Sequence, residues 1–248
     1  MISIEIRTPS FGAGLAIGAP RAAADPGVAA GQPTADLPPA IRALRPMTAG
    51  VVPISVAERQ GRIERATRLM RERGIDALML TGGTSMVYFT GIEWGISERL
   101  LAAFLPVRGR PFLVTPKFEE ERAMEQVALG PMQGGADVYA WEEHEDPYAL
   151  VAQALHARGL ATATIACEET VRFQFSHGIS RLAAVTVVDG TPVTAGCRMV
   201  KDPHEIALLR HASVVTLTAY EAAWKSLREG MTQDAFARLV SAAHARLG

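Results

Sequence analysis

The side chains best suited to chemistry lie in an aromatic and charged stretch between two apolar runs. Residues 88–101 read YFTGIEWGISERLL and include Trp94 and Arg99. An aromatic ring beside a guanidinium suits recognition of a carboxylate or a peptide end. The pattern therefore makes Trp94 and Arg99 candidates for binding substrate. The residue types by themselves favour a structural interpretation, with a packed Tyr88–Phe89 pair and Arg99 paired to a glutamate.

Other short motifs of catalysis are incomplete. In HEIALLRH, residues 204–211, the second histidine stands seven positions after the first, whereas a zinc-protease helix needs four. GISER at 95–99 lacks the final glycine of a hydrolase elbow, and TGGTSM at 81–86 lacks the lysine of a phosphate loop. The acidic residues 142–146 are typical of a solvated loop before a helix. The sequence therefore predicts no catalytic residue and no metal ligand in this chain.

Charge and composition exclude several classes of partner. The 248 residues include 25 Lys and Arg against 26 Asp and Glu, which gives a net charge of −1. This balance provides no basic surface for nucleic acid. No apolar run approaches the roughly 20 residues of a membrane span. We therefore expect neither nucleic acid nor a membrane as partner. Cys167 and Cys197 are too few for a disulfide framework and are expected to be buried.

Residues 1–50 differ from the rest of the chain. An apolar stretch at 11–19 followed by alanines at 22–24 resembles an export signal, but Arg7 is the sole basic residue before it and Glu5 opposes that charge. The alternative is a disordered Ala/Pro tail. The two interpretations leave the compartment open between cytoplasm and periplasm. Residues 31–46 are interpreted as a linker.

Alternating strand and helix patterns follow. Strands are predicted at 75–82, 86–91, 99–107, 110–116, 136–141, 163–169 and 184–190, and an extended connector at 196–200. Helices are predicted at 56–73, 117–129, 146–159 and 170–183. This order indicates a mixed α/β sheet with helices on its faces over residues 51–198, with a hairpin between the third and fourth strands.

Two helices are predicted after this sheet, at 203–229 and 233–247. Asp202 is a good N-cap, Pro203 suits the first helical position, and Glu205 completes a capping box. Apolar residues recur every three or four positions along the first helix, so one face must pack against something. We interpret residues 199–248 as the first elements of a further domain.

Three segments together resemble the Xaa-Pro peptidase family, the group of prolidase, aminopeptidase P and creatinase. They are residues 62–91, 97–123 and 197–212, and the similarity extends over about 57–248. The most specific pattern is R-x-x-K-x-x-x-E-I before a long helix, which is typical of the junction between that family's two domains. Here it consists of Arg198, Lys201, Glu205 and Ile206.

The resemblance implies a creatinase-type N-terminal α/β domain followed by the start of a pita-bread catalytic domain. In the family, that second domain holds two divalent metals, often manganese, through two Asp, one His and two Glu. The metals deliver hydroxide to the peptide carbonyl before proline. These ligands are expected beyond the two helices at 203–229 and 233–247. The expectation is therefore a truncated chain that is inactive by itself and holds no cofactor, from a parent with two metal ions.

The resemblance also implies a homodimer that acts on proline-containing peptides. In the family the N-terminal domain lends residues to the neighbouring subunit's active-site mouth, and by position these are Trp94 and Arg99. Two alternatives stay open. One is a metal-independent C–N hydrolase of the creatinase type, and the other is a non-catalytic dimerisation or binding module.

Overall fold

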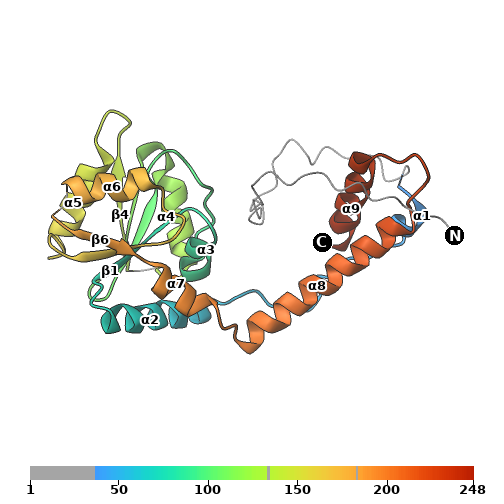
Figure 1. The fold of residues 1–248 in the computed structure, drawn as a ribbon, viewed down its shortest axis with the longest axis horizontal. Helices are drawn as coiled ribbons and strands as arrows, with labels where there is room; N and C mark the ends of the chain where they lie inside the picture. The colour runs from blue at the N-terminus through green and yellow to red at the C-terminus, as the bar shows by residue number, and fades with distance from the viewer. Residues whose placement is uncertain (1–36, 133–134, 183) are drawn as a thin grey trace, which may run out of the picture.

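The computed structural model describes residues 37–248, except for 133–134 and 183. The apolar segment 11–19 and the alanines at 22–24, interpreted as an export signal or tail, lie outside the described residues. Figure 1 shows two parts: an α/β unit, from α2 to α7 (residues 56–198), and a helical unit of α1, α8 and α9. The chain passes between them in the segment from α1 to α2, and again where α7 leads into α8.

Within the described residues, six strands form one mixed sheet in the order β4-β3-β2-β1-β5-β6. The strands are β1 Ala77–Thr81, β2 Ala102–Pro106, β3 Phe112–Pro116, β4 Asp137–Trp141, β5 Thr164–Cys167 and β6 Thr186–Asp189. β2 pairs antiparallel with β1 and β3, and the other neighbours are parallel. The predicted α/β class and the hairpin are confirmed. The central strands are buried on both faces, so they read as continuous apolar runs.

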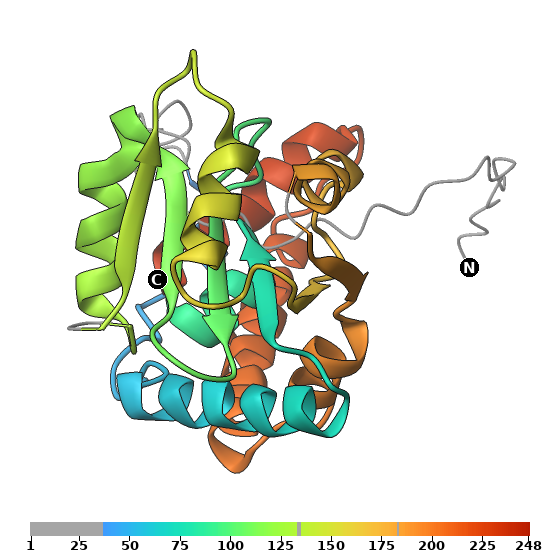
Figure 2. The ribbon, with the colours of Figure 1, turned by 90° about the vertical axis from the view of Figure 1, so that its left-hand side faces the viewer.

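Helices cover both faces of the sheet. They are α2 Val56–Glu72, α3 Thr84–Thr90, α4 Glu120–Leu129, α5 Pro147–His156, α6 Phe173–Leu182 and α7 Thr191–Arg198. One core lies between the sheet and α2, α3, α4 and α7, and a second lies between the sheet and α5 and α6. Figure 2 shows α2 lying across one end of the strands. Local signals fix several helix starts: the Asp146 carboxylate accepts from the backbone N–H of Tyr148, as predicted for α5.

The prediction of a strand at 86–91 is wrong, because this segment lies in helix α3. Its buried residues Ser85, Met86, Phe89 and Thr90 follow helical spacing, and Met86 and Phe89 pack in the core. Gly91, with a φ of 77°, ends the helix in the left-handed region. The aromatic and β-branched residues favour a strand by propensity, but packing against α2 and the sheet stabilises the helix.

The predicted extended connector at 196–200 is also wrong over its first residues, which belong to helix α7. The Asp189 carboxylate accepts hydrogen bonds from the backbone and hydroxyl of Thr191 and starts the turn. Val193 and Cys197 then face the core. A side chain at Gly196 would lie 2.9 Å from Leu69, so this glycine allows α7 to lie close to α2.

The helical unit consists of α1 Pro39–Arg42, α8 Pro203–Trp224 and α9 Gln233–Leu247. α1 lies within the predicted linker, yet its Ile41 is fully buried against α8 and α9. The prediction that the first long helix runs to 229 is wrong, because α8 ends at Trp224. After Trp224 the backbone forms hydrogen bonds to the third preceding residue: the N–H of Ser226 donates to the carbonyl of Ala223, and that of Leu227 to the carbonyl of Trp224. The Ser226 hydroxyl donates to the carbonyl of Ala222.

The large apolar face predicted for α8 is exposed among the described residues. Leu217 and Trp224 are 68% and 70% exposed, whereas the buried positions of α8 are Ala219, Ala222 and Ala223. α8 therefore packs on α1 and α9 through its alanines. None of the helices in the described ranges is sufficiently long and apolar to cross a membrane.

Candidate substrate-binding loop and unit junction

The loop that carries Trp94 and Arg99 connects α3 to β2 at the end of strand β1. It is held there by backbone contacts: a side chain at Gly82 would lie 2.2 Å from the carbonyl oxygen of Gly95. The indole N–H of Trp141 donates to the carbonyl of Leu100 at 3.0 Å, and the backbone N–H of Glu93 donates to the Gln126 side chain. The loop therefore has a defined position relative to the sheet.

Trp94 does not present its ring to solvent. It is 6% exposed, and the guanidinium of Arg122 lies 4.1 Å from the ring centroid. This is a cation–π contact, which covers one face of the ring. Trp94 thus has a structural contact in the loop, while its assignment to substrate stays a prediction.

Arg99 lies on the surface between two carboxylates. Its Nε and one terminal nitrogen bind Glu143 at 2.8 and 2.7 Å, and the other terminal nitrogen binds Glu98 at 2.5 Å. The hydrogen bond to Glu143 raises the pKa of Arg99, and the pKa of Glu98 is lowered by its own backbone N–H and then by Arg99. All three side chains are at least 40% exposed. Water weakens such pairs, so the guanidinium can exchange a glutamate for another carboxylate.

The cleft beside Arg99 is small. It has a volume of about 10 Å³ and is lined by residues that include Ser97, Arg99, Thr170 and Arg172. This volume admits a single water at most. In the described conformation, a peptide carboxylate would therefore reach Arg99 from the surface and not through the cleft.

Three of the four residues of the predicted junction signature lie around a second cavity, away from Arg99. Arg198, Lys201 and Glu205 line one cavity of about 590 Å³ between the α/β unit and α8, whereas Ile206 does not. We call this the junction cavity. Arg198 donates to the hydroxyl of Ser85 at 2.9 Å. Glu205 binds the almost buried Arg62 at 2.7 Å.

Tyr88 forms another wall of the junction cavity and connects three elements. Its hydroxyl donates to the carbonyl of Cys197 at 2.9 Å, and the guanidinium of Arg62 lies 4.0 Å above its ring. Burial raises the pKa of the Tyr88 hydroxyl, and Glu205 raises it further. Tyr88 also stacks edge-on against Phe89, as the structural interpretation of this pair predicts.

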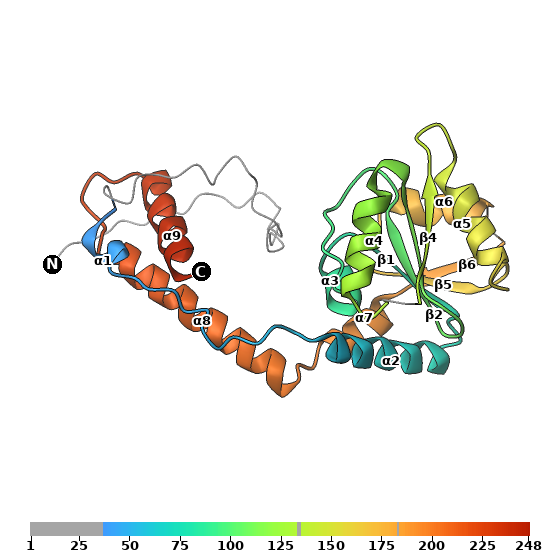
Figure 3. The same cartoon turned by 180° about the vertical axis from the view of Figure 1, so that it is seen from behind.

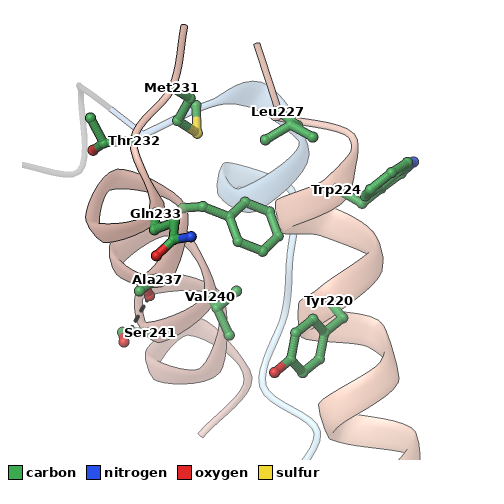
Figure 4. A pocket seen from close by; sticks show the side chains of 10 residues that line it. Tyr220, Trp224, Leu227, Met231, Thr232, Gln233, Ala237, Val240 and Ser241 are labelled. Atoms are coloured by element: carbon green, nitrogen blue, oxygen red, sulfur yellow. Dashed lines mark hydrogen bonds between the residues drawn. The ribbon is translucent and has the colours of Figure 1, made fainter. Parts of the chain in front are cut away.

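A third hollow lies between α8 and α9. It measures about 580 Å³, and its lining is mainly apolar. Figure 4 shows Tyr220 and Val240 facing it from the two helices, while Trp224 projects from α8 away from α9. We call this hollow the apolar groove. It contains no charged side chain, so it suits hydrophobic packing and not proton transfer.

No group of three or more His, Cys, Asp or Glu side chains that could hold a metal ion occurs among the described residues. The acidic residues 142–146 lie on the surface, where Glu143 binds Arg99 and Asp146 caps α5. The described residues therefore do not fit a dinuclear metal centre.

Residues 62–200, more than half of the chain, match the family model for the Creatinase/Prolidase N-terminal domain. This chain belongs to the creatinase/prolidase family. The match includes the whole sheet, the 92–101 loop and the arginines that flank the junction cavity. The resemblance seen in the sequence is thereby confirmed.

Named relatives are peptidases. An uncharacterised peptidase of Schizosaccharomyces pombe is 28% identical over 79% of this chain and 44% of its own length. A Xaa-Pro dipeptidase of Lactobacillus helveticus is 24% identical over 71% of this chain and 47% of its own. The crystal structure of dipeptidase PepE from Mycobacterium ulcerans matches with a TM-score of 0.67 and 28% identity, over 79% of this chain and 51% of that one. The matched part of this creatinase/prolidase chain thus covers about half the length of each of these relatives.

Sequence reasoning missed the partners on α2. His204, in the first turn of α8, binds Glu58, and Glu205, predicted as part of a capping box, also binds Arg62. The paired residues are more than 140 positions apart in this creatinase/prolidase chain. A single sequence gives no signal for such a pairing, but the i, i+4 spacing of Glu58 and Arg62 on a helix shows that they share a face.

Proposed function

We propose that these residues form the N-terminal part of a dipeptidase that cleaves the bond before proline. The observation that carries the proposal is the match to the Creatinase/Prolidase N-terminal domain, together with the longer structural match to PepE. The Xaa-Pro specificity is supported by the Lactobacillus helveticus relative and by the junction signature. In this proposal the α/β unit positions substrate and the bond is cleaved elsewhere.

The described residues do not supply the metal chemistry. They lack a cluster of three metal-binding side chains, so we derive no hydrolytic step through them. We propose that the ligands lie in a part of the enzyme that corresponds to the unmatched half of the relatives. The 248-residue chain is then inactive when assayed by itself.

Arg99 is the proposed contact with substrate, supplied to the active site of a second subunit. A dipeptide ends in a carboxylate, which a guanidinium binds through paired hydrogen bonds. The exposed Glu98 and Glu143 hold Arg99 at the surface and leave when the substrate carboxylate replaces them. Trp94 supports the loop from beneath through its contact with Arg122.

The first experiment is to determine the coding sequence beyond Gly248 and to assay the longest open frame. An open frame with Asp, Asp, His, Glu and Glu in order, whose Mn²⁺-loaded product cleaves Ala-Pro but not Ala-Gly, is the expected result. The 248-residue chain should cleave neither dipeptide. A stop codon after Gly248, or a longer product without activity on Ala-Pro, would contradict the proposal.

The role of Arg99 is tested in the same active product. Arg99→Ala should raise KM for Ala-Pro at least tenfold, with kcat and circular dichroism unchanged, because one paired contact to the carboxylate is lost. Arg108→Ala is the matched control, since Arg108 is exposed in the hairpin at the other end of β2. An equal KM for wild type and Arg99→Ala would remove Arg99 from the site.

A second candidate function is a non-catalytic dimerisation or binding module. The apolar groove and the exposed Leu217 and Trp224 favour it, since exposed apolar patches mark interaction surfaces. A stop codon after Gly248, combined with a soluble dimer of the 248-residue chain by light scattering, would support this candidate over the peptidase.

A further inference from the structure

Helices α2 and α8 begin beside one another, and each start is closed by a capping box. In α2, one carboxylate oxygen of Glu58 accepts from the backbone N–H of Ser55 at 2.7 Å, and the Ser55 hydroxyl accepts from the N–H of Glu58. In α8, one oxygen of Glu205 accepts from the N–H of Asp202 at 3.0 Å, and Asp202 accepts from the N–H of Glu205. Each glutamate uses one oxygen for its own helix.

The second oxygen of each glutamate binds the other helix. Glu58 binds Nδ1 of His204 at 2.5 Å, and Glu205 binds a terminal nitrogen of Arg62 at 2.7 Å. Glu58 and Arg62 lie one turn apart on α2, and their partners are consecutive residues of α8. The two capping boxes are therefore connected by two ion pairs. In one pair the carboxylate is on α2, and in the other it is on α8.

The two pairs differ in their dependence on pH. A guanidinium is not deprotonated in proteins. Arg62 also donates to the carbonyl of Tyr88 at 3.0 Å. His204 has a hydrogen-bond acceptor at each ring nitrogen: Glu58 at Nδ1, and the carbonyl of Val52 at Nε2, 3.0 Å away. A neutral imidazole has one N–H and can donate to one of them, whereas the imidazolium donates to both.

The surroundings of His204 favour its charged form. In the described chain, the titratable groups near it are Glu58 and Arg59 on α2, Asp202 at the cap, and Glu205 and His211 on α8. The segment 47–54, which runs alongside α8 in Figure 3, has no titratable side chain. The hydrogen bond to Glu58 raises the pKa of His204 above 6.5, and the same bond lowers the pKa of Glu58 to about 2.

We propose that this double contact is a pH-sensitive joint that sets the direction of α8 relative to the sheet. With His204 charged, both ion pairs hold and the joint is closed. With His204 neutral, the contact through Glu58 and Val52 is weakened, and α8 turns about the Arg62–Glu205 pair. The 22 residues of α8 extend about 33 Å, so a small rotation at the joint displaces α9 by several ångströms.

The sign of the pH dependence follows from the raised pKa of His204. The stabilisation of the closed joint is fully present below pH 6.5, the ordinary value, and is lost as the pH rises through the higher value in the folded protein. Acid opens the joint only when Glu58 is protonated, at a pH of about 2. The closed joint is therefore the mildly acidic form, and the open joint the alkaline one.

The test measures the distance between the two units in the full 248-residue chain. Spin labels are attached at Glu125→Cys on α4 and Arg238→Cys on α9, both exposed positions. Cys167 and Cys197 remain unlabelled, because burial raises the pKa of their thiols to about 12 and about 11. Electron–electron double resonance should give one narrow distance population at pH 5.5 and a broad one at pH 9.5.

Two variants separate the joint from general effects of pH. His204→Gln retains one hydrogen bond but no charge, so its distance distribution should be broad at both pH values. His211→Gln is the control, because His211 lies on the same helix and binds the carbonyl of Met47 without a carboxylate partner. A wild-type distribution that does not change with pH, or a response that survives in His204→Gln, overturns the proposal.

An NMR titration of the histidines tests the same joint without a spin label. In wild type the pKa of His204 should lie above 6.5, and in Glu58→Gln it should fall toward that value. A wild-type value at or below 6.5 overturns the proposal, whether or not the variants fold.

Discussion

The two units of this chain are both helix-rich, but they bury different kinds of side chain. In the α/β unit, the sheet and its helices enclose large groups such as Phe89, Phe104 and Phe112, all fully buried. In the helical unit the fully buried residues include Ala219, Ala223 and Ala243, and the large apolar residues of α8 face outward. Figure 1 shows the same difference as a thick layered unit and a thin pair of helices.

The contrast separates what starts a helix from what stabilises it. α2 and α8 both begin with a complete capping box, so their local signals are equally good. A buried phenylalanine contributes about 1.5–3 kcal/mol by leaving water, and an alanine contributes far less. We therefore expect most of the free energy of unfolding to come from the α/β unit, while α8 exposes large apolar side chains.

The largest test of this contrast compares two aromatic truncations. Phe104→Ala should lower the free energy of unfolding by about 3–5 kcal/mol, because it leaves a cavity in a close-packed core. Trp224→Ala should change it by less than about 0.5 kcal/mol, because that side chain is 70% exposed. Urea unfolding followed by circular dichroism measures both. Similar losses in the two variants would show that Trp224 is covered in solution.

The second test concerns the ion pair that connects the units. Arg62→Met should cost about 3 kcal/mol, because the Arg62 and Glu205 side chains are 9% and 14% exposed and Glu205 loses its cation. A double-mutant cycle with Glu205→Gln isolates the pairwise energy. Lys225→Met is the control, since its pair with Glu221 on α8 is exposed, and it should leave the urea midpoint unchanged. A cycle energy of zero would mean that the units are not coupled through this pair.

Periodicity and capping residues were sufficient to predict most elements of the fold. The capping residues Asp146, Asp202 and Thr232 each accept from a backbone N–H at the predicted helix start. The two wrong elements, α3 and α7, are short and rich in residues of low helix propensity, so tertiary packing determines them. What makes α3 and α7 helical is their packing against α2, and the sequence of neither segment shows that packing.

The candidate site was less accessible to sequence reasoning than the fold. The stretch around Trp94 and Arg99 was found by residue type, but residue type does not show which ring face is covered or which glutamate lies nearby. Arg122 and Glu143 supply those contacts from 28 and 44 positions away. Arg198, Lys201 and Glu205 of the predicted junction signature line one cavity, whereas the pairing of Glu205 with Arg62 follows from the way α2 and α8 meet.

The third test concerns the close approach that fixes the 92–101 loop. Gly82→Ala should cost about 1–3 kcal/mol, because its side chain would lie 2.2 Å from the carbonyl oxygen of Gly95 and the loop must shift. The same shift moves Arg99, so in an active enzyme this variant should also raise KM. Gly135→Ala, where no atom lies within 4 Å of an added side chain, is the control for unfolding. An unchanged midpoint in Gly82→Ala would mean that the loop is not held by this contact.

The smallest test asks whether the two units unfold together. Gly61→Ala places a better helix former at an exposed position of α2 with no atom within 4 Å, and should stabilise the α/β unit by about 0.5–1 kcal/mol. Ser213→Ala, exposed on α8, removes a hydroxyl that bonds back to the carbonyl of Leu209 and should stabilise α8 by about 0.5 kcal/mol. Amide hydrogen exchange reports each unit separately.

If Gly61→Ala slows exchange in the α/β unit alone and Ser213→Ala in α8 alone, the units are independent, and the joint at Glu58 and Arg62 orients α8 without stabilising it. If each substitution slows exchange in both units, the interlocked capping boxes make them one cooperative structure, and the difference in burial between them does not translate into a difference in stability.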